Sequence, residues 1–217
     1  MVDYNSDEER FTAVVDFFKR NKNSILLTFG AVFLVAVSSI SFNAYKNSQN
    51  AQAAELYDVW FTGVAEETSD PAKTDIAYSS LQENFLKTGY AGLARVIKGS
   101  QYAREGDFDS SLKEFKALLD STSGLFGNDV LNSIARINIA RIELSKNNYV
   151  NVIEVLDPLS SSAEHSMVFE IKGDALSGLM KNKLALTQYN IALKNMQDES
   201  QKSLLKIKIN QLTQSTK

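Results

Sequence analysis

Side chains suited to catalysis are scarce in this 217-residue chain. It contains one histidine, His165, and no cysteine, which excludes cysteine nucleophiles and the common zinc sites. Any Ser-His-Asp arrangement would need His165, whose serine and glutamate neighbours are typical of a loop ahead of a helix. We therefore expect no catalytic residue and no metal site, and we interpret His165 as a surface or helix-start residue.

Carboxylate pairs and glycines give no stronger signal for chemistry. Pairs such as Glu66-Glu67 and Asp107-Asp109 are expected in a chain with 26 acidic residues, and Asp107 has the type and place of a turn residue. The glycines between positions 89 and 106 are typical of turns and helix packing rather than of a phosphate-binding loop. We expect no cofactor, no small-molecule substrate and no enzymatic activity.

Charge also argues against a nucleic-acid partner. Residues 47–217 contain 18 Lys or Arg and 21 Asp or Glu, and no basic stripe with interleaved aromatic residues occurs among them. This part of the chain is mildly acidic.

The interval 23–45, between Lys22 and Lys46, carries no charge. As a helix it would be about 34 Å long, enough to span roughly 30 Å of hydrocarbon. Its apolar residues point all round such a helix, which disfavours a buried core helix with one apolar face. A cleaved export signal is a second alternative, because the most apolar run, 25–37, is short and a small-residue stretch, Val37-Ser38-Ser39, follows it.

Residues 1–22 favour an uncleaved anchor over a cleaved signal. They are longer and more acidic than a signal's basic leader, and their apolar residues have helical spacing. Acidic residues 7–9 suit the start of this helix, and basic residues 19–22 suit its end. Because Lys and Arg concentrate on the cytoplasmic side of a span, we predict a cytoplasmic N-terminus and an external C-terminal part, periplasmic in a Gram-negative bacterium.

Downstream of the span the sequence predicts helices throughout. It has two prolines and no run of alternating β-branched residues. A tetratricopeptide-like helix-turn-helix pattern recurs three times, with a small residue on the first helix and a large one sixteen positions later on the second. Small residues let paired helices approach closely. The small residues are Gly99, Ala140 and Gly173, and the large ones are Phe115, Leu156 and Tyr189.

The remaining segments extend this repeat. Residues 47–60 are predicted to continue the membrane helix outward. The aromatic residues Tyr57, Trp60 and Phe61 are expected to pack on the first helical pair, with a partner-binding surface as the alternative. Residues 74–90 are expected to supply the second helix of that degenerate pair, and residues 121–129 a loop that lengthens the first full repeat. Residues 199–214 have the mixed composition of a solvated capping helix.

We therefore predict an all-α protein: a single N-terminal transmembrane helix followed by a tetratricopeptide-like helical-repeat solenoid. The predicted parts are a cytoplasmic amphipathic helical segment at 1–22, a transmembrane helix at 23–45 and a periplasmic repeat domain at 46–217. Such solenoids bind protein partners on the faces of their inner helices. Candidate partner-binding residues on the first helices are Arg95, Tyr102, Arg136 and Arg141.

The order of these parts resembles the ancillary SecYEG translocon subunit family, the YfgM-like proteins of Gram-negative bacteria. The similarity is carried by "SDEERFTAVVDFFKRN" before the span, the stem "NSQNAQAAELYDVW", "KGDAL" in the third repeat and the closing "KIKINQL". It implies a non-enzymatic, single-pass inner-membrane adaptor associated with the SecYEG translocon. It also implies a membrane-anchored periplasmic chaperone of the peptidyl-prolyl isomerase type as a partner, to which emerging proteins are passed.

Two other functions fit the same helices. One is a scaffold for envelope assembly or cell division. The other is a regulator that acts through residues 1–22 on a stress-response regulator, a role the family resemblance also suggests.

Overall fold

The computed structural model describes residues 7–66, 70–125, 127–160 and 166–214. These residues form nine α-helices and one short 3-10 helix, and no strand occurs among them, which confirms the all-α prediction. They divide into two compact units, one up to Gln52 and one from Ala53 onward.

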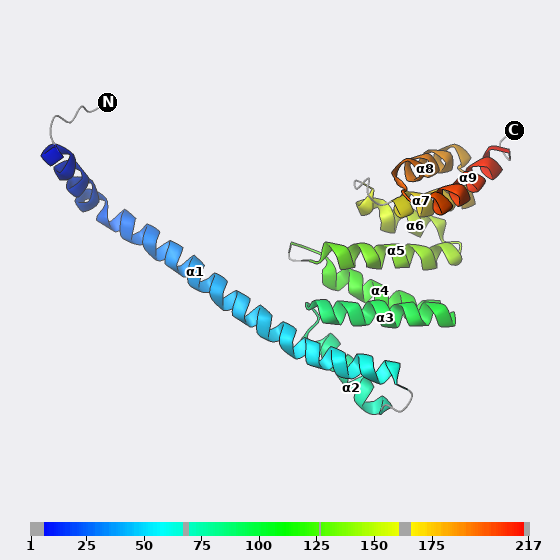
Figure 1. Cartoon of the computed structure of the whole chain (residues 1–217), viewed down its shortest axis with the longest axis horizontal. Helices are drawn as coiled ribbons and strands as arrows, with labels where there is room; N and C mark the ends of the chain where they lie inside the picture. The colour runs from blue at the N-terminus through cyan, green and yellow to red at the C-terminus, as the bar shows by residue number, and fades with distance from the viewer. Residues whose placement is uncertain (1–6, 67–69, 126, 161–165, 215–217) are drawn as a thin grey trace. The chain divides into compact units, whose positions relative to one another are not determined.

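Helix α1 (Asp7–Ala65) contains the predicted span (Figure 1). It is the one helix of the described residues that is long and apolar enough to cross a membrane, and none of its most apolar window is buried. The sequence predicted a helix end near Lys22, which is wrong: α1 continues through that point. No glycine or proline occurs between positions 19 and 29 to stop it.

The second unit begins with a hairpin of the last turns of α1 and helix α2 (Pro71–Asn84). Asp70 caps α2, because its Oδ1 accepts the Ala72 N–H at 3.0 Å. Trp60 is only 2 % exposed, and its ring centroid lies 5.6 Å from that of Tyr78 on α2. The expected packing on the first helical pair is therefore confirmed for Trp60, whereas Phe61 is 45 % exposed.

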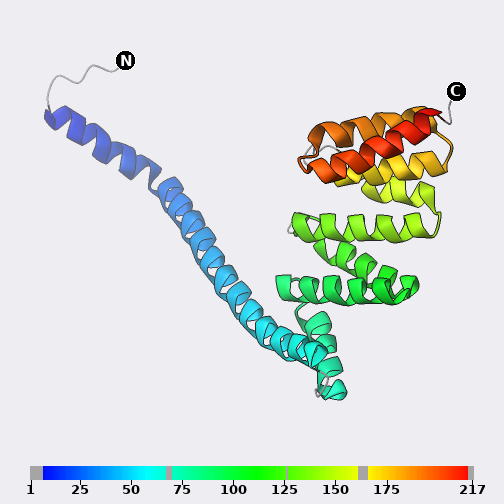
Figure 2. The same cartoon turned by 45° about the vertical axis from the view of Figure 1, so that its right-hand side comes forward.

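Three further hairpins follow in chain order. They are α3 (Gly89–Glu105) with α4 (Phe108–Thr122), α5 (Asp129–Ser145) with α6 (Tyr149–Leu156), and α7 (Ser166–Gly178) with α8 (Asn182–Asn195). The 3-10 turn η1 (Asp157–Leu159) extends α6, and α9 (Glu199–Gln214) closes the unit. Figures 1 and 2 both show α3 to α9 stacked in sequence, each hairpin on the next.

Polar caps set where several of these helices begin. The side chains of Thr88, Asp107 and Asn128 each accept a backbone N–H from the first turn of α3, α4 and α5 respectively. Hydrogen bonds from Ser110 lower the pKa of the Asp107 carboxyl, so the cap stays ionised at neutral pH. The turn role predicted for Asp107 is confirmed.

The turns inside the three hairpins each contain one residue with a left-handed backbone conformation. Gly106, Asn147 and Met180 have φ of 81°, 60° and 57°, in the left-handed region. Each lies seven residues after the small residue of its first helix. Left-handed residues commonly end helices, and only glycine adopts this conformation without steric cost.

The apolar core continues from one hairpin into the next. Phe115 and Leu118 of α4 cluster with Leu131, Ala135 and Ile139 of α5. A second cluster joins α5, α6 and α7, and a third joins α7, α8 and α9. Each hairpin therefore buries its apolar surface on its neighbours, the arrangement expected of a helical-repeat protein.

Candidate functional site

Each full hairpin pairs a small residue on its first helix with a large one on its second. A Cβ on Gly99 would lie 3.0 Å from Cε2 of Phe115, and a Cβ on Gly173 would lie 2.4 Å from Cδ1 of Tyr189. In the middle hairpin, Ala140 clusters with the fully buried Leu156. Ser111 Oγ also donates to the Gly99 carbonyl at 2.7 Å across the first hairpin. The predicted repeat register is confirmed.

This register defines a shared surface on the first helices. Helix α3 contacts α5, and α5 contacts α7, so the first helices lie side by side. On each first helix we consider two positions, counted from the small residue Gly99, Ala140 or Gly173: the residue six positions before it and the residue one position after it. These two positions are seven residues apart, about two helical turns, and therefore lie on the same face of the helix. We call these six residues the first-helix face: Leu93, Ser100, Ile134, Arg141, Met167 and Asp174.

The first-helix face carries a repeated apolar row. Leu93 is 45 % exposed, Met167 is 42 % exposed, and Ile134 is half-buried. Apolar side chains left accessible at the same position of successive repeats suit an interaction surface better than a core. The sequence analysis missed this row because it ranked polar and aromatic residues. The signal was present in the fixed offset of six residues from each small residue.

Of the four predicted partner-binding residues, Arg141 is the one that belongs to the first-helix face. It is exposed on α5, and its Nη2 donates to Met167 Sδ of α7 at 3.0 Å. The contact places a cation beside an exposed apolar side chain of the next repeat. This pairing of a cation with apolar surface can bind a polypeptide through both side chains and backbone carbonyls.

Arg95 lies on α3 but is directed at the second helix of its own hairpin. Its Nη1 donates to Glu114 Oε2 at 2.7 Å, and the two side chains are 14 % and 12 % exposed. The Tyr78 hydroxyl of α2 donates to the same oxygen at 2.6 Å, and Lys98 Nζ lies 3.9 Å from the Tyr78 ring centroid. Burial, with the nearby Glu114 carboxylate, raises the pKa of Tyr78. Glu114 thus links Arg95 of its own hairpin to Tyr78 of the first hairpin.

The other two predicted residues also interact within the repeat unit or are half-buried in it. Arg136 Nη1 donates to the Val155 carbonyl of α6 at 3.0 Å, and its Nε donates to Asn132 Oδ1 at 2.8 Å. Tyr102 is half-buried on α3, and burial raises its pKa. The four residues lie on two helices that contact each other, α3 and α5.

An ion-pair network covers the α7 end of the first-helix face. Lys208 Nζ of α9 lies 2.8 Å from Glu170 Oε1 and 2.9 Å from Asp174 Oδ1, and the Tyr189 hydroxyl donates to Asp174 at 2.8 Å. Burial opposes the charge on Lys208, but its hydrogen bonds to Glu170 and Asp174 outweigh that effect and raise its pKa. Lys208 thus offsets the carboxylate charge and fixes α9 to α7.

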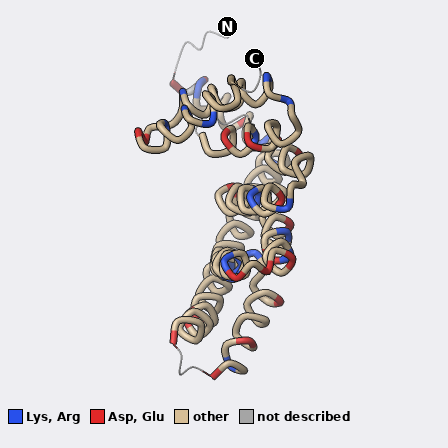
Figure 3. Tube along the Cα trace, turned by 90° about the vertical axis from the view of Figure 1, so that its right-hand side faces the viewer, with Lys and Arg blue, Asp and Glu red and all other residues tan. Residues whose placement is uncertain are grey.

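The structure offers little for cofactor or metal binding in the part that it describes. No group of three or more His, Cys, Asp or Glu among the described residues is placed to hold a metal ion. His165 and Glu67 lie outside the described residues. Asp109, the partner of Asp107 in the second carboxylate pair, forms an exposed ion pair with Lys146 at 2.8 Å. Figure 3 shows basic and acidic residues interspersed along the helices rather than gathered in one stripe.

Comparison with known families agrees with this geometry. A tetratricopeptide repeat-like domain family matches residues 16–214, nearly the whole chain. The chain belongs to this family. No curated protein and no solved structure matches it at a significant level. Tetratricopeptide repeat-like domains are typically non-enzymatic scaffolds that bind proteins, so the family favours protein partners for the first-helix face.

Proposed function

We propose that this protein is a membrane-anchored adaptor that binds protein partners through its first-helix face. The observation that carries the proposal is the row Leu93, Ile134 and Met167 at the same position of three repeats, in which Leu93 and Met167 are exposed and Ile134 is half-buried. A solenoid presents such rows to an extended or helical polypeptide, which can then contact several repeats at once. The unburied apolar window of α1 supports an anchor at 23–45. The basic residues just before this interval support a cytoplasmic segment 1–22 and a periplasmic domain 46–217.

The proposed partners are the Sec translocon and a periplasmic chaperone of the peptidyl-prolyl isomerase type. In this role the adaptor sits in the inner membrane and helps pass newly translocated proteins to the chaperone. The resemblance of the N-terminal segment, the stem and the closing helix to the translocon-associated family supports these partners. An accessible apolar row beside Arg141 suits clients that emerge as unfolded chains, because these expose both apolar side chains and backbone carbonyls.

Site-specific photocrosslinking in living cells tests this proposal. A photoreactive amino acid is placed at Met167 on the first-helix face and, as the matched control, at Lys116, an exposed residue of the second helix α4. We expect adducts with the translocon channel or the isomerase-type chaperone from Met167 and not from Lys116. Adducts from Met167 only with cell-wall or outer-membrane assembly proteins would instead support the envelope scaffold. Equal adducts from both positions would contradict the assignment of the binding face.

A further inference from the structure

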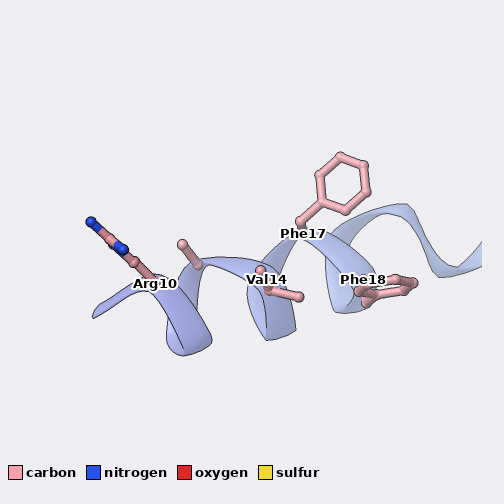
Figure 4. A pocket seen from close by; sticks show the side chains of 5 residues that line it. Arg10, Val14, Phe17 and Phe18 are labelled. Carbon is pink, nitrogen blue, oxygen red and sulfur yellow. The ribbon is translucent and has the colours of Figure 1, made fainter. Parts of the chain in front are cut away.

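The first turns of α1 carry an aromatic surface that no part of the described chain covers. Its members, which we call the N-terminal aromatic face, are Phe11, Val14, Phe17 and Phe18, with exposures between 53 % and 71 %. Figure 4 shows Val14 and Phe18 one turn apart, Phe17 pointing to a different side of the helix, and Arg10 at the far end. Aromatic side chains this exposed are unusual on a helix that faces only water.

Helical spacing gives this segment two distinct sides. Phe11, Val14 and Phe18 are separated by three and four residues, so they lie on one side of α1, whereas Phe17 directly precedes Phe18 and points away from that side. Glu9, Asp16 and Arg20 follow the same kind of spacing and lie on the opposite side. Segment 7–22 is therefore amphipathic, whereas the interval 23–45 that follows is apolar all round.

Acidic residues lie at the N-terminal end of the segment, and basic residues lie at its C-terminal end. Asp7 and Glu9 stand at the end far from the apolar interval, whereas Lys19, Arg20 and Lys22 immediately precede it and are all exposed. Basic residues at this place lie at the depth of the lipid headgroups if the apolar interval spans the bilayer, and they attract anionic lipids there.

The helix also bends in this region. Figures 1 and 2 both show a bend in the blue part of α1. In that part, Asn21 Nδ2 donates to the Phe17 carbonyl at 2.9 Å. A side chain that bonds to a carbonyl one turn back competes with the backbone ladder, and this is a known cause of helix bending. A bend between an amphipathic and an apolar segment lets the two take different directions.

We propose that residues 7–22 lie in the surface of the membrane as an interfacial helix. Phe11, Val14 and Phe18 insert between the upper parts of the acyl chains, and Lys19, Arg20 and Lys22 contact anionic headgroups. This inference rests on the proposed anchoring by residues 23–45. A lipid surface is favoured over a protein partner because the aromatic face is continuous with the apolar interval and the basic residues stand at their junction.

Labels at single cysteines test the inference, because the natural chain has no cysteine. Environment-sensitive fluorophores are attached to the full-length protein at Val14→Cys on the aromatic face and at Thr12→Cys on its polar flank. Leu34→Cys reports on the anchor. The proteins are reconstituted in vesicles of phosphatidylethanolamine and phosphatidylglycerol that contain quencher-labelled lipids, and iodide is added as the aqueous quencher.

We expect shallow lipid quenchers to quench the Val14 label at least about threefold more than the Thr12 label, with the opposite order for iodide. Replacing Lys19, Arg20 and Lys22 by glutamine should reduce this contrast, and an unchanged contrast would overturn the headgroup contact. Equal iodide quenching of both labels, with the Leu34 label still quenched by lipid, would overturn the inference but leave the anchor intact.

Two further outcomes would also be decisive. A Val14 label shielded from iodide but not quenched by lipid would indicate a protein contact and overturn the lipid assignment. Loss of lipid quenching at Leu34 would overturn the anchor itself, and with it the proposed membrane-bound function.

Discussion

At the scale of single residues, the turn that ends α7 contains a strained position. Met180 has φ 57° and is 88 % exposed, so its side chain contributes little packing to offset the unfavourable backbone conformation. At the equivalent turn after α3, the chain has Gly106. The third repeat thus retains the backbone conformation of the first without its most suitable residue.

Replacing Met180 by glycine should stabilise the repeat unit by about 1 kcal/mol, because a left-handed conformation costs a non-glycine residue roughly that amount. Met180→Ala is the control, since it removes the same side chain but keeps the Cβ that causes the strain. Urea unfolding of the full chain in detergent, followed by circular dichroism, measures both variants. Equal stability of the glycine and alanine variants would contradict the strain argument.

Because of the buried contact between Tyr78 and Glu114, we expect the folded state to lose stability as the pH rises in the alkaline range. An unfolded tyrosine has a pKa of about 10. Burial and the Glu114 carboxylate raise the pKa of Tyr78 in the folded state, so above pH ~10 the unfolded chain releases a proton that the folded chain keeps. The stabilising effect is complete below pH ~10 and falls by up to about 1.4 kcal/mol per pH unit above it.

Tyr78→Phe should therefore make the loss of stability between pH ~9.5 and ~11 less steep. Fluorescence of Trp60, the one tryptophan of the chain, reports on unfolding there because its ring packs against residue 78. If the variant and the natural protein lost stability with the same slope, the Tyr78 hydroxyl would not be held protonated by the fold.

Sequence spacing predicted some of these residue roles and not others. The pairing of Gly99 with Phe115 follows from a fixed spacing along the chain, so it was visible in the sequence. The ion pair of Arg95 with Glu114 depends on how α3 rotates against α4, which local spacing does not specify. For that reason Arg95 resembled an exposed binding residue in the sequence, although the fold buries most of its side chain.

At the scale of elements, α9 is the closing helix that the sequence predicted. It packs through one side, because Leu205 is fully buried in a cluster with residues of α7 and α8 while the adjacent Leu204 is 63 % exposed. Lys208 adds ion pairs to Glu170 and Asp174 on α7. The apolar surface of the last hairpin is therefore covered largely through one side of α9.

Leu205→Ala should destabilise the repeat unit by about 2–5 kcal/mol, because it leaves a cavity between α8 and α9. Leu204→Ala should change stability by no more than about 0.5 kcal/mol, since its side chain is mainly in solvent. Urea unfolding compares the two variants, which differ only in the face of α9 that they alter. Similar effects of both substitutions would show that α9 does not dock through Leu205.

Helix boundaries were predicted well where a residue type fixes them. Asp107 and Gly106 mark the turn between α3 and α4 in both the sequence and the structure. The boundary expected at Lys22 was inferred from charge alone, and charge at a helix end stabilises that end without stopping the helix. Nothing in the sequence near Lys22 prevents α1 from continuing.

At the scale of the whole molecule, two observations support the proposed function: the family assignment concerns the partners, and the apolar interval of α1 concerns the membrane anchor. The repeat family covers residues 16–214 and indicates protein partners. The unburied apolar window of α1 is long and apolar enough to cross a membrane. The fold class could be predicted from periodicity and composition, whereas the apolar row on the first helices required knowledge of which positions the repeats leave accessible.

The proposed function requires that the protein is anchored with residues 1–22 in the cytoplasm and its repeat domain outside. Single cysteines at Thr12 and at Ser200, an exposed residue of α9, test it with a membrane-impermeant maleimide applied to cells whose outer membrane is permeabilised. We expect labelling of Ser200→Cys before the inner membrane is lysed and of Thr12→Cys only after lysis. Labelling of Thr12→Cys before lysis, or protection of Ser200→Cys until lysis, would contradict it.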